Sequence, residues 1–364
     1  MMLFLCGDVM TGRGIDQVLP SPVDPTLHEP YVDDAREYVR LAERANGVIP
    51  APVDFRYVWG DALAELERAG PEARIVNLET SITTSEAWEP KGINYRMHPE
   101  NVSCLTAAGI DCCVLANNHV LDWGLAGLEE TLETLNGVGL GSAGAGRDWE
   151  EAWAPGVVRT GRGRVLIFGL GGPDSGVPRS WAATGRRPGV GFVGDWSDAA
   201  ADEVVAHVGR FRESGDLVVV SVHWGGNWGY AVPRAHRRFA HRLVDSGAVE
   251  VIHGHSSHHP RGIEVRRGRP ILYGCGDFLN DYEGISGHEE YRADLALMYL
   301  ITLSTVGLAG FRMVPFRRRR LRLERASGSD ASWIAGTLDR ESARFGTRVA
   351  ADGDDTLHVQ WDGA

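Results

Sequence analysis

The sequence predicts an α/β fold, and two observations support this class. Short apolar runs typical of buried strands recur along the 364 residues, and segments with helical periodicity separate several of them. In addition, a cluster of polar residues follows directly after six of the apolar runs. Strands that alternate with helices are typical of α/β sheets, in which ligands bind beyond the carboxyl ends of the strands.

The predicted elements follow in chain order. Strands are expected at 2–6, 74–76, 112–116, 165–169, 217–222, 249–252, 271–273 and 297–303. Helices are expected at 60–69, 125–135, 198–213 and 233–246. The apolar stretch 295–311 approaches the length of a membrane span, but its β-forming residues and the VGLAG turn predict a sheet hairpin instead.

A single main domain is expected over residues 1–315, because all six polar clusters lie within it. Segment 16–57 reads as an insertion after the first strand that forms a lid or a substrate wall. Residues 316–364 are expected to form a peripheral C-terminal segment. Its arginine-rich start is interpreted as a solvated strand edge or turn rather than an anion-binding patch.

Composition excludes some classes of partner and favours one compartment. Lys and Arg number 37 against 49 Asp and Glu, and the formal charge of −12 argues against a nucleic-acid partner. The five cysteines show no CxxC spacing, so free thiols in a reducing compartment are expected. The apolar N-terminal run is too short for a secretory signal. We therefore expect a cytoplasmic protein without a membrane partner.

The polar clusters predict one metal site. They read GDVMTGR from residue 7, VNLETS from 76, ANNHVLDWG from 116, VHWGGNWG from 222, IHGHSSHHP from 252 and GCGDFLND from 274. Because each follows a predicted strand, the clusters should converge at the carboxyl edge of the sheet. Carboxylate, amide oxygen and imidazole together suit a divalent ion such as Mn, Fe, Zn or Ca.

These six clusters, in this order and at about this spacing, resemble the CapA-type proteins of the poly-γ-glutamate capsule family over residues 1 to about 315. The resemblance implies a calcineurin-like metallophosphoesterase fold, which is a layered αββα sandwich with its site at the carboxyl ends of the strands. It places the following residues at metal positions: Asp8, Glu79, Asn118, His223, His255 and His258. His119 lies beside them as an acid/base or an anion contact.

Three departures from the family pattern predict a mononuclear or weakened site. Val9 and Met10 follow Asp8, so the histidine of the DxH motif is missing. Glu79 stands where an aspartate would bridge two metals, and Ser256 replaces a family histidine. Asp277 and Asp281, where the family usually reads GNF, are interpreted as local structure.

Further residues are expected to contact the substrate, although each has a structural alternative. The expected contacts are Arg13, Asn77, Asn117, Trp224 and Trp228. The tryptophans could instead belong to the core, and Asn117 and His119 could bond the backbone at a strand end. His288 lies on a glycine-bounded loop and is either an acid/base group or an exposed loop histidine.

The leading functional hypothesis is a two-base peptide epimerase. The chain resembles the cytoplasmic lasso-peptide epimerases, which invert the C-terminal residue of a ribosomally made precursor peptide. Asp8 and either His288 or His119 would serve the two faces of Cα, while the metal polarises the terminal carboxylate. The alternatives are a metal-dependent hydrolase of phosphoester or γ-glutamyl bonds, and a non-catalytic capsule-assembly binding protein, which the charge of −12 disfavours.

Overall fold

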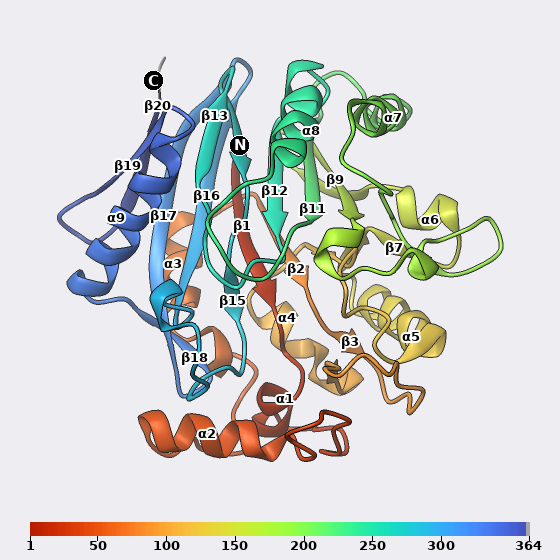
Figure 1. The fold of residues 1–364 in the computed structure, drawn as a ribbon, viewed down its shortest axis with the longest axis vertical. Coiled ribbons are helices and arrows are strands. Elements are labelled where there is room, and N and C mark those ends of the chain that lie inside the picture. Colours follow the sequence, from red (N-terminus) through yellow and green to blue (C-terminus); the bar gives the residue numbers. More distant parts are fainter. Residues whose placement is uncertain (362–364) are drawn as a thin grey trace.

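In the computed structural model, which describes residues 1–361, two large β-sheets pack against each other and helices cover both outer faces (Figure 1). The first sheet has the spatial order β19 (Thr347–Ala351), β20 (Leu357–Trp361), β17 (Gly307–Arg319), β16 (Leu295–Ser304), β1 (Met2–Val9), β2 (Ala73–Leu78), β5 (Cys112–Val114) and β6 (Gly141–Ala143). In addition, β15 (Asp277–Leu279) pairs with β1, and β18 (Arg322–Arg325) pairs with β17.

The second sheet has the order β13 (Ile263–Arg266), β14 (Arg269–Leu272), β12 (Val251–His255), β11 (Leu217–His223), β9 (Gly163–Gly171) and β8 (Gly156–Thr160). Its four central strands are parallel, and the two edge strands are antiparallel to their neighbours. Two short pairs complete the strands: β3 (Ser81–Ile82) with β4 (Arg96–Met97), and β7 (Ala145–Gly146) with β10 (Gly189–Val190).

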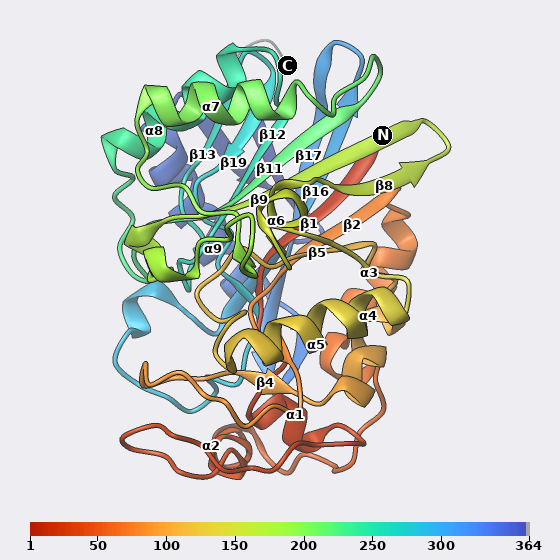
Figure 2. The same ribbon diagram turned by 90° about the vertical axis from the view of Figure 1, so that its right-hand side faces the viewer.

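Nine α-helices of more than one turn lie among the described residues, some on the outer faces of the sheets and others at their ends. They are α1 (Gly14–Val18), α2 (Arg36–Asn46), α3 (Ala62–Ala69), α4 (Ser103–Ala107), α5 (Gly124–Gly137), α6 (Trp149–Trp153), α7 (Asp198–Val208), α8 (Arg234–Asp245) and α9 (Gly328–Ala343). Figure 2 shows α7 and α8 on one outer side of the stacked sheets and α4 and α5 on the other. The predicted α/β fold with αββα layers is therefore confirmed.

Alternating strand residues feed separate cores, which explains the layering. In β1, Leu3 and Leu5 join the cluster between the two sheets, whereas Phe4 joins the cluster beneath α3, α4 and α5. In β11, Val219 faces the core between the sheets, and Val220 packs beneath α7 and α8. Strands buried on both faces read as continuous apolar runs, which is why the sequence reveals them.

All eight predicted strands and all four predicted helices overlap an observed element. The stretch 295–311 forms the antiparallel pair of β16 and β17, as predicted. Within residues 1–361, no helix combines the length and apolar character that crossing a membrane requires. The described cysteines are all buried and free, as the odd count and spacing suggested.

The C-terminal residues extend the first sheet. The expected boundary at 315/316 falls inside β17, and β20 pairs with that strand through Arg312 and His358. The arginine-rich stretch forms the end of β17, the turn at 320–321 and β18. At the opposite end of the fold, α1 and α2 of the expected insertion lie beyond the carboxyl end of β1 (Figure 1).

Because β1 and β15 approach closely at Gly7, a methyl group added there should strongly destabilise the fold. A Cβ added at Gly7 would lie 1.6 Å from the carbonyl oxygen of Gly276, so the two strands would have to separate. Gly7→Ala should lower the free energy of unfolding by at least about 2 kcal/mol in urea denaturation. The matched control is Gly336→Ala in α9, where a Cβ meets no atom within 4 Å and the change should be neutral or stabilising. Equal effects of the two substitutions would contradict this packing argument.

Candidate metal centre

Side chains from both sheets meet at the carboxyl ends of the central strands. We call this set the donor group, and it consists of Asp8, Glu79, Asn118, His223, His255, His258 and Asp277. β1, β11, β12 and β15 supply four members, and the segments directly after β2, β5 and β12 supply Glu79, Asn118 and His258. The structure thus brings together the six residues expected at metal positions, and it adds Asp277.

The donor group contains two overlapping ligand sets that share Asp8. Potential ligand atoms of Asp8, His223 and His255 all lie within 4.8 Å of one another, and so do those of Asp8, His258 and Asp277. All five side chains are buried. Each set alone would offer three ligand atoms to one ion, and the two sets together would serve two ions that share Asp8. The donor group therefore fits one ion or two, and the expectation of a mononuclear or weakened site stays a prediction.

One carboxylate oxygen of Asp8 is buried without a hydrogen-bond partner among the described residues, and a bound cation would compensate it. Its Oδ1 accepts a hydrogen bond of 2.8 Å from Asn77, but its buried Oδ2 has no partner among the described residues. Burial and the nearby charge of Asp277 raise the pKa of Asp8 to about 7. Burial and Asp8 likewise raise the pKa of Glu79 well above its ordinary value. Because buried charges need compensation, these carboxylates with their neighbouring imidazoles fit a divalent ion.

The two imidazoles of the first ligand set are held in their neutral form. The Nδ1 atoms of His223 and His255 lie 2.8 Å apart, and Nε2 of His223 lies 3.0 Å from Oδ1 of Asn118. Nε2 of His223 is also 3.7 Å from Oε1 of Glu79. Burial lowers the pKa of both histidines well below the ordinary value. Neutral imidazoles retain the lone pair that a metal requires.

A hydrogen-bond chain fixes which nitrogen of His255 faces the donor group. Nε2 of His253 donates to the carbonyl of Cys6 at 2.7 Å, and burial lowers the pKa of His253 to about 4. Its Nδ1 must therefore accept from the Ser221 hydroxyl, at 2.9 Å. Ser221 in turn accepts from Nε2 of His255 at 2.9 Å. This leaves Nδ1 of His255 unprotonated and directed toward the donor group.

The second ligand set is held in a different way. Nδ1 of His258 contacts Oδ1 of Asp277 at 2.9 Å, and Asn280 donates to Oδ2 of Asp277 at 2.7 Å. Burial opposes a charge on His258, but Asp277 raises its pKa above the ordinary value. Asp277 therefore does more than local structure, which corrects the interpretation made from the sequence.

Asn77 and Asn117 orient the carboxylates from within the protein. Asn77 donates to Asp8 and, at 3.1 Å, to Oε2 of Glu79. Its own oxygen accepts from Asn117 at 3.0 Å. Both asparagines are fully buried, so the structure gives them positioning contacts rather than the expected contacts with substrate.

His119 lies at the border of the donor group. Its Nδ1 contacts Asp122 at 2.6 Å, and its Nε2 lies 3.9 Å from Oε1 of Glu79. The ammonium of Lys91 binds Asp122 at 2.7 Å from the other side. Burial lowers the pKa of His119 to about 4, so its Nε2 presents a lone pair toward Glu79.

Arg13 and Trp224, both expected at the substrate, lie elsewhere. Arg13 is buried and binds Glu29 at 2.8 Å and also Asp281, so it ties segment 16–57 to the chain after β15. Trp224 is fully buried, stacks on His236 with ring centroids 4.7 Å apart and belongs to the core beneath α8. Residue type alone did not distinguish these packing contacts from a pocket wall.

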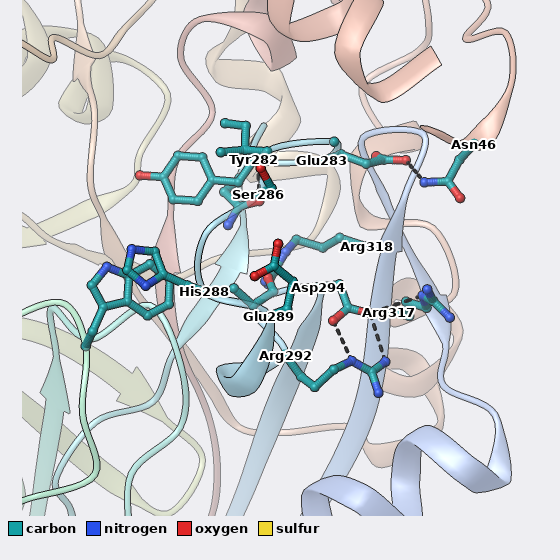
Figure 3. A pocket seen from close by; sticks show the side chains of 15 residues that line it. Asn46, Tyr282, Glu283, Ser286, His288, Glu289, Arg292, Asp294, Arg317 and Arg318 are labelled. Atoms are coloured by element: carbon teal, nitrogen blue, oxygen red, sulfur yellow. Dashed lines mark hydrogen bonds and ion pairs between the residues drawn. The ribbon is translucent and has the colours of Figure 1, made fainter. Parts of the chain in front are cut away.

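Trp228 and His288 line a cavity beside the donor group. Their rings stack with centroids 3.9 Å apart, and the Trp228 ring lies 5.3 Å from that of His258. The cavity has a volume of about 390 Å³, and Asn280 also lines it. Figure 3 shows His288 among its lining side chains. His288 is exposed and remains outside the donor group.

The sequence matches the model of a known protein family. The model of the bacterial capsule synthesis protein family PGA_cap matches residues 2–282, which include every member of the donor group. The chain belongs to this family. The expectation of a capsule-family protein is therefore confirmed, and the metallophosphoesterase-like layering of the family agrees with the observed sheets.

Several similar proteins have names that refer to capsule, PGA or polyglutamine synthesis. A Mycobacterium tuberculosis protein named "Probable polyglutamine synthesis accessory protein" is 49% identical over 362 residues, covering 98% of this chain and 95% of that protein. The PGA biosynthesis protein CapA of Bacillus subtilis is 29% identical over 278 residues, covering 76% of this chain and 62% of the relative. The capsule biosynthesis protein CapA of Bacillus anthracis is 28% identical over 191 residues, covering 52% and 45%.

The hydrogen-bond chain through Ser221 predicts a loss of metal affinity when its hydroxyl is removed. Ser221→Ala should weaken the binding of Mn²⁺ or Zn²⁺ by about 10–100-fold, because His255 can then adopt the wrong tautomer. Competition with a fluorescent chelator measures this affinity. Ser257→Ala is the control, since that equally buried hydroxyl donates only to the carbonyl of His259. Indistinguishable affinities of the two variants would show that the chain through Ser221 does not orient His255.

The raised pKa of Asp8 predicts a characteristic pH dependence in the metal-free protein. With a pKa of about 7 when folded and near 3.8 when unfolded, Asp8 holds a proton in the folded state that the unfolded state releases. Its contribution to stability therefore falls as pH rises from about 4 to about 7. Asp8→Asn should raise the free energy of unfolding at about pH 8 by about 1–3 kcal/mol, and change it little at about pH 4.

Urea denaturation in the presence of a chelator provides the measurement. Asp216→Asn is a control of opposite sign, because its hydrogen bond with Arg164 lowers the pKa of that carboxyl and stabilises its charged form. A less stable Asp8→Asn protein at about pH 8 would mean that the Asp8 charge is compensated without metal.

Proposed function

We propose that the protein is a divalent-metal-dependent hydrolase of amide bonds in a glutamate-containing polymer or peptide. The observation that carries this proposal is Asp8, which is shared by two buried ligand sets beside a cavity. Shared carboxylates of this kind are used in metal-assisted hydrolysis. The names of the relatives, which refer to capsule, PGA and polyglutamine synthesis, support a glutamate polymer as the substrate class.

Under this proposal, the members of the donor group would hold the metal. Asp8, His223 and His255, with Glu79 and Asn118 nearby, would hold one ion, and Asp8, His258 and Asp277 would hold another. A divalent metal bound there supplies Lewis acidity, which polarises the substrate carbonyl and acidifies water.

His119 is the residue placed to move a proton. The Nδ1–H group of His119 donates a hydrogen bond to Asp122, which leaves the Nε2 lone pair directed toward the donor group. There His119 can take a proton from the attacking water and return it to the leaving amine. Asp122, neutralised in part by Lys91, holds the imidazole in this orientation.

Two-base epimerisation of a peptide is the second candidate, and Asp8 is again the observation that favours it. The unpartnered Oδ2 and the pKa of about 7 suit a general base near neutral pH. His288, at the cavity, would serve the other face of Cα. The partner would then be the C-terminus of a precursor peptide, and the product would keep its length.

One set of assays separates these reactions. Metal-free protein is loaded with Mn²⁺, Zn²⁺, Fe²⁺ or Ca²⁺ and incubated in D₂O with γ-glutamyl oligomers, with a peptide or with p-nitrophenyl phosphate. Hydrolysis of the oligomer is expected to release new amino groups and shorter chains. Deuterium at Cα without shortening would identify an epimerase, and release of p-nitrophenol would identify a phosphoesterase. No turnover with any metal would leave a binding protein and contradict the proposal.

Two histidine substitutions, one inside and one outside the donor group, test its role in turnover. His255→Gln is expected to reduce kcat/KM by at least about 100-fold, because a metal ligand is lost. His241→Gln is the control, since His241 binds Glu264 at 2.9 Å and lies outside the donor group. Similar rates in the two variants would exclude His255 from the reaction.

A further inference from the structure

Arg318 is a buried cation whose hydrogen bonds go to backbone carbonyls rather than to a carboxylate. Only 4% of its surface is exposed, and it lines the cavity next to the donor group. Its guanidinium donates to the backbone carbonyls of Asp277, Phe278 and Ala293. Within residues 1–361, it makes no ion pair, and its Nε donates no hydrogen bond.

The other arginines of the cavity already have carboxylate partners, and Glu289, an exposed lining carboxylate, accepts from the backbone amide of Gly287 at 3.0 Å. Arg292 binds Asp294 at 2.8 Å and Asp330 at 2.7 Å, and Arg317 binds Asp294 at 3.2 Å. The carboxylate of Glu283 accepts from the backbone amides of residues 320 and 321, at 2.8 and 3.0 Å. Arg318 is therefore the lining cation with capacity for an incoming anion.

Strand alternation aims Arg318 inward. Arg317 and Arg319 are exposed on β17, whereas Arg318 between them is buried. Figure 3 shows the Arg318 side chain in the middle of the lining, between Tyr282 and Ser286 on one side and Arg292 and Asp294 on the other. The stretch interpreted from the sequence as a solvated strand edge or turn thus contains a buried side chain that lines the cavity.

The cavity adjoins the ligand set of Asp8, His258 and Asp277. Asn280 lines the cavity and also donates to Asp277, while Trp228 lines it and contacts His258. The backbone carbonyl of Asp277 binds Arg318 directly. A group held on Arg318 would therefore lie close to the ligand set of Asp8, His258 and Asp277.

We propose that this cavity binds a carboxylate of the substrate, with Arg318 as its receptor. The free N–H groups of a guanidinium match a carboxylate, and the rings of Trp228 and Tyr282 with Ile285 offer apolar contact to methylene groups. A carboxylate on a short aliphatic chain is the chemistry of a glutamyl residue. This assignment rests on the proposed hydrolase for its choice of substrate, but binding in the cavity requires no turnover.

Calorimetry on the metal-free protein tests the site. The probe is tri-γ-glutamate, and its neutral counterpart is the same trimer with every carboxylate amidated. The acidic trimer should bind wild type at least about 10-fold more tightly than the amidated trimer, and Arg318→Gln should abolish this difference. Arg318→Lys should retain part of it. The control Arg312→Gln removes the same charge from the same strand outside the cavity, and should change the dissociation constant less than about 2-fold.

Two outcomes would overturn the assignment. Equal affinity of wild type for the acidic and amidated trimers excludes a carboxylate receptor without relying on any variant. Unchanged binding by Arg318→Gln excludes Arg318. If the trimer binds as expected but no metal supports its shortening, the hydrolase proposal fails and the cavity assignment stands. If the trimer is shortened while Arg318→Gln leaves KM and affinity unchanged, the reverse holds.

Discussion

The buried carboxylate of Asp8 is the constraint on which the centre of the structure depends. A buried charge at the end of a central strand has a high desolvation cost. The neighbouring strands supply groups that change this cost. β2 contributes the amide of Asn77, β11 and β12 contribute neutral imidazoles, and β15 brings a second carboxylate close enough to raise the Asp8 pKa. A glycine before Asp8 allows β15 to approach β1. The protein therefore gives up stability at this point and gains capacity for a cation.

Much of the fold could be predicted because its strands are buried on both faces. A run such as residues 217–222 is apolar at nearly every position, so the strand is evident without knowledge of its neighbours. The division into two sheets could not be predicted in the same way, because residues facing either core have the same chemistry. Strands of only two residues, such as β7 and β10, are too short to carry a pattern. The C-terminal strand β20 joins the first sheet through pairing that is remote in sequence.

The donor group shows a similar division. Asp8, His223 and His255 end or nearly end their strands, so position along the chain indicated where they would meet. Asp277 follows a turn after β14 rather than the strand itself, and its contact with His258 depends on the pairing of β15 with β1. Arg13 and Trp224 stand next to strand ends too, but buried partners turn them away from the site. Position along the chain predicts which residues lie at the carboxyl edge of a sheet. Side-chain packing determines which of them are free to bind a ligand.

The anchoring of segment 16–57 has a consequence for the shape of the cavity. Arg13 forms buried ion pairs with Glu29 of this segment and with Asp281, and separating them would expose uncompensated charges. Asn46 of the same segment lines the cavity together with the exposed loop at 284–290. The buried ion pairs therefore hold one wall of the cavity in place, and the loop forms its exposed side.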